Sequence, residues 1–297
     1  MSIVEKALKK LQIATSSAPE ARVQKPPRSA APPAPRPLPD AARSALAVPI
    51  VVPKHTITID FRALQSAGLV VPDELVHPFL DQYRRVKWPV LAGAFGSPEE
   101  VVPRGNLVMV TSSLPSEGKT FLSVNLGLSI ASERDCKLLL VDADVAKRHL
   151  TKLLGLDRAP GLLDLLAPDK HSIDDVLVGS DLDQLMILPA GVAKAQAPEL
   201  LASRRMELVA QELATRFADH IVLFDSSPLL LTNESQVLSK LVGQVLLVVR
   251  ANHTPQAAIL EAIGLLDQRA RTSCVLNQVA GGMLKYGYSE YPYYENK

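Results

Sequence analysis

An eight-residue segment, 113–120, combines the residue types that capture phosphate. It reads Ser-Leu-Pro-Ser-Glu-Gly-Lys-Thr, after an apolar run at 107–110 and before a helical pattern at 119–132. Between a strand and a helix, successive backbone N–H groups and the helix N-terminus attract anions. A lysine there reaches the β- and γ-phosphates, and a hydroxyl binds Mg²⁺. The sequence therefore predicts a P-loop that binds ATP and Mg²⁺ through Lys119 and Thr120.

The match to G-x-x-x-x-G-K-[ST] is incomplete because Ser113 stands at the first glycine. A Gly-Lys-Thr triplet also occurs by chance, but the flanking strand and helix favour a P-loop. Asn277 closes the last predicted strand, where it either binds the base or forms a turn. The residues expected to bind the nucleotide are Ser113, Pro115, Ser116, Glu117, Gly118, Lys119, Thr120, Phe121 and Asn277.

Three carboxylates follow two further apolar strands. Asp142 and Asp144 come after the run at 138–141, and Asp225 comes after the run at 221–224. A single Asp after a strand often caps a turn, but three acids at the carboxyl ends of two strands favour a metal site. We expect Thr120, Asp142, Asp144 and Asp225 to hold Mg²⁺, and Lys119, Asp142 and Asp144 to act in catalysis.

Strands and helices alternate through the second half of the chain. Apolar strands are predicted at 107–110, 137–141, 185–188, 221–224, 245–249 and 274–276, with helices at 119–132, 198–217, 234–241 and 255–268. A short strand at 56–59 and a helix at 74–86 precede them. This order predicts an α/β fold: a mostly parallel, P-loop NTPase-like sheet with helices on both faces. Ligands in such folds bind at the carboxyl ends of the strands.

Composition limits the class of protein. The 297 residues carry a formal net charge of +1, so a strongly basic nucleic-acid binder is not indicated. The two cysteines, Cys136 and Cys274, form no metal-ligand spacing and no disulfide framework. The six histidines form no recognisable constellation. The apolar runs are shorter than the roughly 20 residues of a membrane span, and no cleavable signal is predicted.

Five segments are expected along the chain. Residues 2–11 have the pattern of a basic amphipathic helix, which favours either an anionic membrane surface or a protein partner. The proline-rich stretch that follows is typical of a stiff, disordered linker. The predicted boundaries are 1–13 for the helix, 14–53 for the linker, 54–104 for a lead-in with an oligomerisation-type helix, 105–282 for the P-loop domain and 283–297 for a tyrosine-rich tail.

Taken together, these motifs resemble those of the bacterial tyrosine kinases, and more closely the branch found beside exosortase and exopolysaccharide loci. The Walker A motif corresponds to 113–120, the second D-x-D motif to 142–144 and Walker B to 225–228. The helix around 81–87 resembles the family's oligomerisation motif. The resemblance covers about four fifths of the chain and implies ATP-dependent phosphorylation of protein tyrosine. It also implies a homo-oligomer, either a ring or a dimer.

Several positions depart from the family pattern. Ser116 replaces a glycine, so the loop is expected to be less free to adopt positive φ. Ala146 replaces a basic residue, and Ser227 replaces a proline. Asp81 and Lys87 replace Glu and Arg in the oligomerisation motif. These changes remove no phosphate or metal ligand, but they favour slower turnover.

The C-terminal tail holds most of the tyrosines. They are Tyr286, Tyr288, Tyr291, Tyr293 and Tyr294. One interpretation is an aromatic tail that packs on a partner or adds an edge strand. Beside a P-loop of this family, the cluster favours autophosphorylation in another subunit's site, with Asp142 accepting the phenol's proton. Charge repulsion between the added phosphates is then expected to disassemble the oligomer.

The leading hypothesis is a tyrosine autokinase that regulates exopolysaccharide synthesis or export. We expect it in the cytoplasm, peripheral to the inner face of the membrane. The resemblance implies that the cytoplasmic segment of a membrane-spanning chain-length-type protein activates it. The alternatives are a Min/Par-type ATPase switch, which would carry a lysine where Leu114 stands, and a nucleotide-binding scaffold with weak catalysis.

Overall fold

The computed structural model describes residues 53–69, 76–133, 135–168, 171–192 and 196–279. The predicted N-terminal helix, nearly all of the proline-rich stretch and the five tail tyrosines lie outside these ranges. Within the described residues, no helix combines the length and the apolar character that a bilayer crossing needs.

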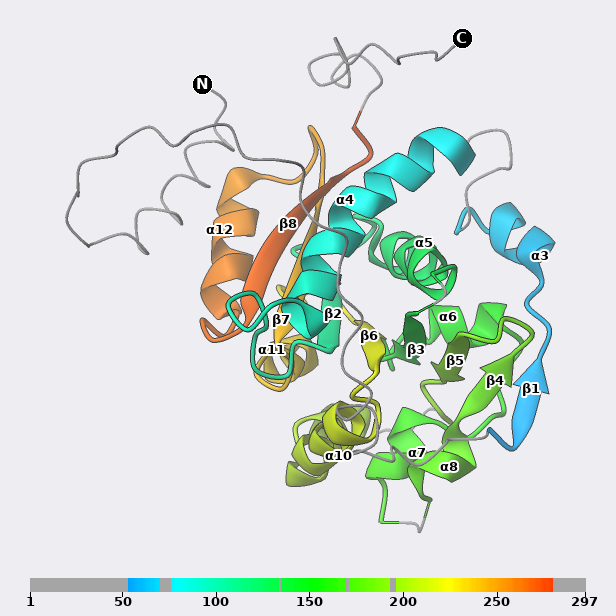
Figure 1. The fold of residues 1–297 in the computed structure, drawn as a ribbon. Coiled ribbons are helices and arrows are strands. Elements are labelled where there is room, and N and C mark those ends of the chain that lie inside the picture. Colours follow the sequence, from blue (N-terminus) through cyan, green and yellow to red (C-terminus); the bar gives the residue numbers. More distant parts are fainter. Residues whose placement is uncertain (1–52, 70–75, 134, 169–170, 193–195, 280–297) are drawn as a thin grey trace, which may run out of the picture. The chain divides into compact units, whose positions relative to one another are not determined.

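A mostly parallel sheet of eight strands forms the centre of the described domain (Figure 1). Its order is β1-β4-β5-β3-β6-β2-β7-β8, and only the β4–β5 pair is antiparallel. The predicted α/β fold is therefore confirmed. The strands are β1 His55–Ile57, β2 Leu107–Ser112, β3 Lys137–Asp142, β4 Val178–Ser180, β5 Leu185–Leu188, β6 His220–Asp225, β7 Gln244–Arg250 and β8 Arg271–Asn277.

Helices cover both faces of this sheet. They are α3 Phe61–Ser66, α4 Val76–Phe95, α5 Lys119–Ala131, α6 His149–Leu153, α7 Leu162–Leu166, α8 Ile173–Val176, α9 Ala197–Leu201, α10 Arg204–Arg216, α11 Asn233–Ser239 and α12 Gln256–Leu265. Successive strand residues point to opposite faces, and both faces are buried, so the middle residues of the central strands are apolar. Met109 packs with α10 and α12, whereas Val108 and Val110 pack with α4 and α5.

Two helix predictions were wrong in extent. The helix expected at 198–217 is two helices, α9 and α10. Ser203 interrupts them: its backbone is extended, and its side chain accepts a hydrogen bond from Met206 N, which caps α10. The helix expected to end at residue 86 continues through Pro89 to Phe95. Pro89 removes one backbone donor, which opposes a helix at this position. The next residue, Val90, is buried in the core, and this packing favours continuation of the helix.

Several short elements were not predicted: α3, α6, α7, α8 and strand β4. Each has three to six residues, too few for a periodic pattern to stand out. They surround the β5 side of the sheet, whereas the P-loop side follows the prediction. The strands and the loop that position the candidate site were thus accessible from sequence, whereas α6, which carries Thr151 beside Asp142, was not.

Candidate functional site

The segment between β2 and α5 curls back at the carboxyl edge of the sheet. Ser112 ends β2, Gly118 caps α5 with a φ of 96°, and Lys119 begins the helix. Ser116 has a φ of 62°. The loop therefore adopts the left-handed backbone that the serine was expected to hinder, at a cost of about 1–2 kcal/mol relative to glycine. A side chain at Gly118 has no room, because its Cβ would lie 2.0 Å from Asn277 Nδ2.

Glu117 holds the loop from inside. Its side chain is buried and accepts a 2.8 Å hydrogen bond from Leu114 N through Oε2. Thr254, at the end of β7, donates its hydroxyl to Oε1 of the same carboxylate. The Glu117 side chain thus braces the loop, and only its backbone amide remains a candidate phosphate ligand.

Asn277 lies against this loop at the end of β8. Its Nδ2 donates to Glu117 O at 2.9 Å, and its Oδ1 accepts from Gln278 N at 2.9 Å. The side chain therefore supports both the loop and a local turn. An amide has a second N–H and a second lone pair, so contact with a base stays a prediction.

Lys119 is buried at the start of α5. Burial lowers its pKa, while the nearby carboxylates of Asp225 and Asp144 act in the opposite direction. An ammonium group held inside the loop next to carboxylates has the charge and the position to meet a triphosphate. The structure brings Lys119 together with the acids, as the sequence predicted.

Asp142 and Asp225 are direct neighbours in the sheet register. Asp142 Oδ2 accepts hydrogen bonds from Thr151 N at 2.8 Å and Thr151 Oγ1 at 2.7 Å, whereas its buried Oδ1 has no protein partner. Burial raises the pKa of Asp142 to about 6, against the hydrogen bonds from Thr151. One oxygen of this carboxylate is therefore fixed and the other is available to a cation or a proton.

Asp225 is fully buried at the end of β6. Burial and then the charge of Asp142 raise the pKa of Asp225 to about 7, against hydrogen bonds from Thr120 and Ser123. Ser123 Oγ lies 2.9 Å from Asp225 Oδ1. Thr120 and Asp225, both expected near the metal, are thus in direct contact. Burial drives both carboxylates toward protonation, and the charge of Lys119 offsets this only in part at Asp225.

Asp144 is held by Ser227, which was noted from the sequence only as a departure from the family pattern. Ser227 Oγ donates to Asp144 Oδ1 at 2.9 Å, and Lys147 N approaches the same oxygen at 3.3 Å. The serine in place of proline therefore adds a hydrogen bond. Ala146 is exposed beside this site, as is Lys147. Among the described residues, the contacts of Asp144 come from Ser227 and the backbone of Lys147, and buried Lys119 is a nearby cation.

The residues present fit a hydrated Mg²⁺ better than a protein-caged metal. In the described part of the chain, no three His, Cys, Asp or Glu side chains form a group that could hold a metal. Mg²⁺ usually takes one or two carboxylates and fills its other positions with water and phosphate oxygens. The unpartnered Asp142 Oδ1 and Ser113 Oγ, both buried, are oxygen atoms left for such contacts. A divalent ion would also remove the cost of the two buried carboxylates.

Sequence reasoning missed Thr151, Ser227 and Thr254, which fix Asp142, Asp144 and Glu117. Ser227 and Thr254 contact residues 83 and 137 positions away, so no local signal marks them. Thr151 lies nine positions after Asp142, in helix α6, which was not predicted. Ser227 was noted, but only as a replacement for proline. The acids and the loop were found because they directly follow apolar strands.

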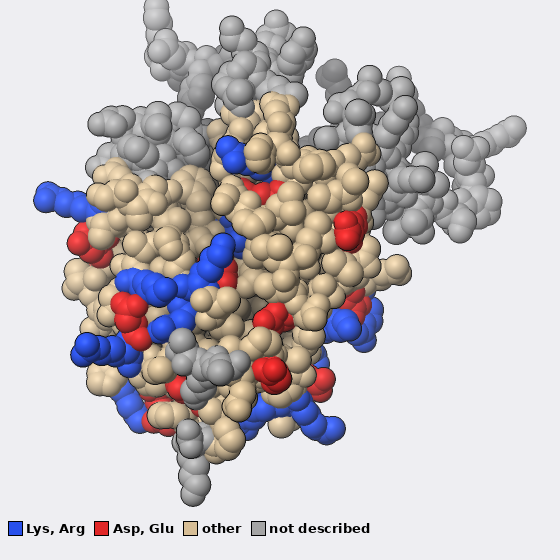
Figure 2. Space-filling view, turned by 180° about the vertical axis from the view of Figure 1, so that it is seen from behind, with Lys and Arg blue, Asp and Glu red and all other residues tan. Residues whose placement is uncertain are grey.

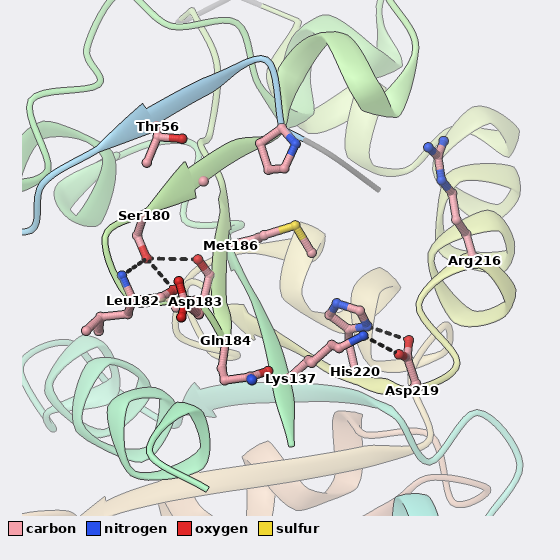
Figure 3. Close-up of a pocket in the computed structure, with 13 residues that line it drawn as sticks. Thr56, Lys137, Ser180, Leu182, Asp183, Gln184, Met186, Arg216, Asp219 and His220 are labelled. Carbon is pink, nitrogen blue, oxygen red and sulfur yellow. Dashed lines mark hydrogen bonds and ion pairs between the residues drawn. The ribbon is translucent and has the colours of Figure 1, made fainter. Parts of the chain in front are cut away.

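A separate cavity of about 350 Å³ lies at the opposite, amino edge of the sheet (Figure 3). Lys137 and His220, the first residues of β3 and β6, line it together with Asp219. Lys137 Nζ and His220 Nδ1 lie 2.8 and 2.6 Å from the Asp219 carboxylate. Lys137, His220 and Asp219 thus pair with one another, and this cavity is distinct from the phosphate loop in place and in character.

Charge on the rear face gives no sign of a nucleic-acid interface. Figure 2 shows basic and acidic side chains interspersed over that face. A nucleic-acid surface requires Lys and Arg gathered on one side. The face therefore agrees with the near-neutral composition.

Comparisons with known proteins point to one group of enzymes. The chain is 35% identical over 186 residues to the putative tyrosine-protein kinase EpsB of Ralstonia nicotianae, covering 62% of this chain and 24% of EpsB. It is 29% identical to the tyrosine-protein kinase YwqD of Bacillus subtilis, covering 64% of this chain and 78% of YwqD. The kinase domain of VpsO superposes with a TM-score of 0.57 at 29% identity, covering 70% of this chain and all of that domain.

The match is partial in length. The chain spans about a quarter of the EpsB relative. No protein-family model matches the chain. The similarity is therefore one of sequence and fold over the domain that carries the phosphate loop.

Proposed function

We propose that this chain, a relative of the bacterial tyrosine-protein kinases, transfers the γ-phosphoryl group of ATP to tyrosines of its own C-terminal tail. The observation that carries the proposal is the phosphate loop with Lys119 beside two desolvated carboxylates, Asp142 and Asp225. A divalent cation would offset the charge of these carboxylates, and the Mg²⁺ that accompanies ATP is such a cation.

The backbone amides of residues 113–120 would hold the β-phosphate, and Lys119 would contact the β- and γ-phosphate oxygens. Thr120, Asp142, Asp144 and Asp225 are the proposed holders of Mg²⁺, with Asp142 acting through a water on the ion so that its Oδ1 stays available to the tyrosine proton. When bound, the ion neutralises charge that develops on the transferring phosphoryl group. Phe121 and Asn277 are the proposed contacts to the base.

Asp142 is the proposed acceptor of the tyrosine proton. Its pKa of about 6 leaves it mostly ionised at neutral pH, and its Oδ1 has no protein partner. The phenol O–H proton passes to this oxygen while the phenol oxygen forms a bond to the γ-phosphorus. The bond from that phosphorus to the ADP oxygen breaks, and ADP leaves.

The phosphate acceptors in this proposal are Tyr286, Tyr288, Tyr291, Tyr293 and Tyr294. The tail would enter the site of another subunit in a homo-oligomer. Each phosphate brings close to two negative charges, so several together would repel one another and release the tail. Phosphorylation would then disassemble the oligomer.

We further propose a setting for this activity. The kinase would regulate exopolysaccharide synthesis or export from the cytoplasmic side of the membrane. A cytoplasmic segment of a membrane-spanning chain-length-type polysaccharide protein would activate it. These statements rest on the resemblance of the motifs and on the kinase names of the relatives.

The test is the intact mass of the full chain before and after incubation with ATP and Mg²⁺, with and without the partner's cytoplasmic segment. We expect added phosphoryl groups on the tail, and none in Lys119→Met. Lys152→Met, an exposed lysine on α6, is the matched control and should behave as the wild type. Equal phosphorylation in the Lys119 variant would refute the proposal. ATP binding with no gain of mass in any condition would favour the scaffold alternative.

A further inference from the structure

Helix α4 has one face that packs on the domain and one that does not. Tyr83, Lys87 and Val90 are buried, and Lys87 Nζ donates to Ser129 O at 3.1 Å and also pairs with Glu133. Lys87 thus holds the C-terminal end of α5, where a cation is favourable. This placement directs Lys87 into the domain rather than toward another molecule, whatever its counterpart does in the family's oligomerisation motif.

The other face presents large apolar side chains to solvent. Trp88 is 67% exposed and Phe95 is 41% exposed, and half-buried Leu91 lies between them. The spacing of three and four residues puts all three on one stripe of the helix. They line a groove of about 490 Å³, here called the α4 groove. Exposed aromatic side chains grouped around a hollow are typical of a protein-interaction site.

The residues that line the rim of the α4 groove are acidic. Glu100, Asp135 and Asp219 line it, and no Lys or Arg is among the described residues that do. Arg271 lies just outside the groove, where it donates to Glu100 O at 2.6 Å. Hydrogen bonds from the backbone and side chain of Ser97 lower the pKa of Glu100, which keeps it ionised. Lys137 pairs with Asp219 from the side of the other cavity. An occupant should therefore be apolar on one side and positively charged at its margins.

We infer that the α4 groove docks a basic amphipathic helix of a partner polypeptide. A helix with apolar residues three and four apart matches the Trp88–Leu91–Phe95 stripe, in the common helix-in-groove mode. Its lysines or arginines would face the acidic rim. A second copy of the same face would bring its own acidic rim against this one, and like charges oppose that arrangement. An anionic membrane surface is disfavoured for the same reason.

Trp88 is the single tryptophan of the chain, so its fluorescence reports on this groove alone. The probe is a synthetic amphipathic peptide of Leu and Lys, about four helical turns long. Added to the full chain, it should shift the Trp88 emission to shorter wavelength in a saturable way. A matched peptide with Glu in place of every Lys should produce no shift.

A variant with reversed charges on the rim of the α4 groove tests whether the peptide binds there. The double change Glu100→Lys and Asp135→Lys alters two exposed residues and should weaken the Leu/Lys peptide at least tenfold. Glu261→Lys, an exposed position on α12, is the control and should bind as the wild type. An unshifted emission with both peptides, equal shifts with both, or full binding by the double variant would each overturn the proposal. A shift with phosphatidylglycerol vesicles and none with the Leu/Lys peptide would do the same.

Discussion

Strands β3 and β6 carry charged residues at both of their ends, and the two ends differ in how those charges are paired. At the amino edge, Lys137 and His220 share the carboxylate of Asp219. At the carboxyl edge, Asp142 and Asp225 lie side by side with Lys119 as the nearby cation. Paired charges of the first kind stabilise a fold, whereas crowded buried carboxylates cost stability and indicate a binding site.

The pKa directions follow the same division. Burial acts to raise the pKa of Asp219, but hydrogen bonds from Lys137 and His220 hold it below its ordinary value. At the other edge burial prevails, and the pKa of Asp225 rises to about 7. A lowered pKa thus marks a carboxylate whose charge is paired within the protein, and a raised pKa marks a buried carboxylate that is open to a ligand.

The largest expected effect is on the carboxyl edge. Asp225→Asn removes a buried charge while leaving an acceptor for Ser123, so the nucleotide-free protein should gain about 1–3 kcal/mol in free energy of unfolding. The same change should abolish tail phosphorylation. Denaturant unfolding at pH 8 without nucleotide checks the first outcome. A loss of stability would show that Asp225 is already satisfied.

The second prediction concerns pH. A carboxyl whose folded pKa is raised costs stability at every pH above that pKa, and the cost falls as the group protonates. Between pH 8 and 6.5 the nucleotide-free protein should therefore gain about 1 kcal/mol as pH falls through the pKa of Asp225. Below this window His220 opposes the trend, because burial lowers its pKa. Asp225→Asn should flatten the profile, and an unchanged slope would contradict the assignment.

Asp219→Asn tests the amino edge and should have the opposite sign. It breaks the contacts with Lys137 and His220, but the Asp219 side chain is 44% exposed, so the expected loss is only about 0.5–1 kcal/mol. Unfolding at pH 7 measures it. ATP affinity should not change. If Asp219→Asn instead raised the free energy of unfolding, the charges at the two edges of the sheet would not differ in the way described above.

The smallest effect is expected within the loop. Ser116→Gly relieves the positive φ but makes the unfolded chain more flexible, so the net gain should be below about 1 kcal/mol. Ser116→Ala keeps the strain and serves as the control. Thermal unfolding of the three proteins compares them. A clear loss in the glycine variant would mean that the serine side chain supports the loop.

The sequence was sufficient where buried strands end in polar residues. Each of the strands before Ser113, Asp142 and Asp225 contains an apolar run, at 107–110, 138–141 and 221–224, and parallel strands bring their carboxyl ends to one edge. The order of elements and the position of the loop followed from that pattern. The central strands and the edge that carries the candidate site were therefore predictable without tertiary information.

The sequence was insufficient where contacts are distant or elements are short. Thr254 donates a hydrogen bond to Glu117, which lies 137 positions earlier in the chain, and no local sequence pattern predicts this contact. Strand β4 is the three residues Val178–Ser180, and only its pairing with β1 and β5 makes it a strand. Trp88 and Phe95 stayed unremarked because the helix was expected to end before them.

Calorimetric titration of ATP into the purified full chain, with Mg²⁺ present, tests the central claim most directly. The account predicts saturable binding that weakens when Mg²⁺ is chelated and falls at least tenfold in Lys119→Met. Binding of equal strength in that variant, or no binding by the folded wild type, would contradict it.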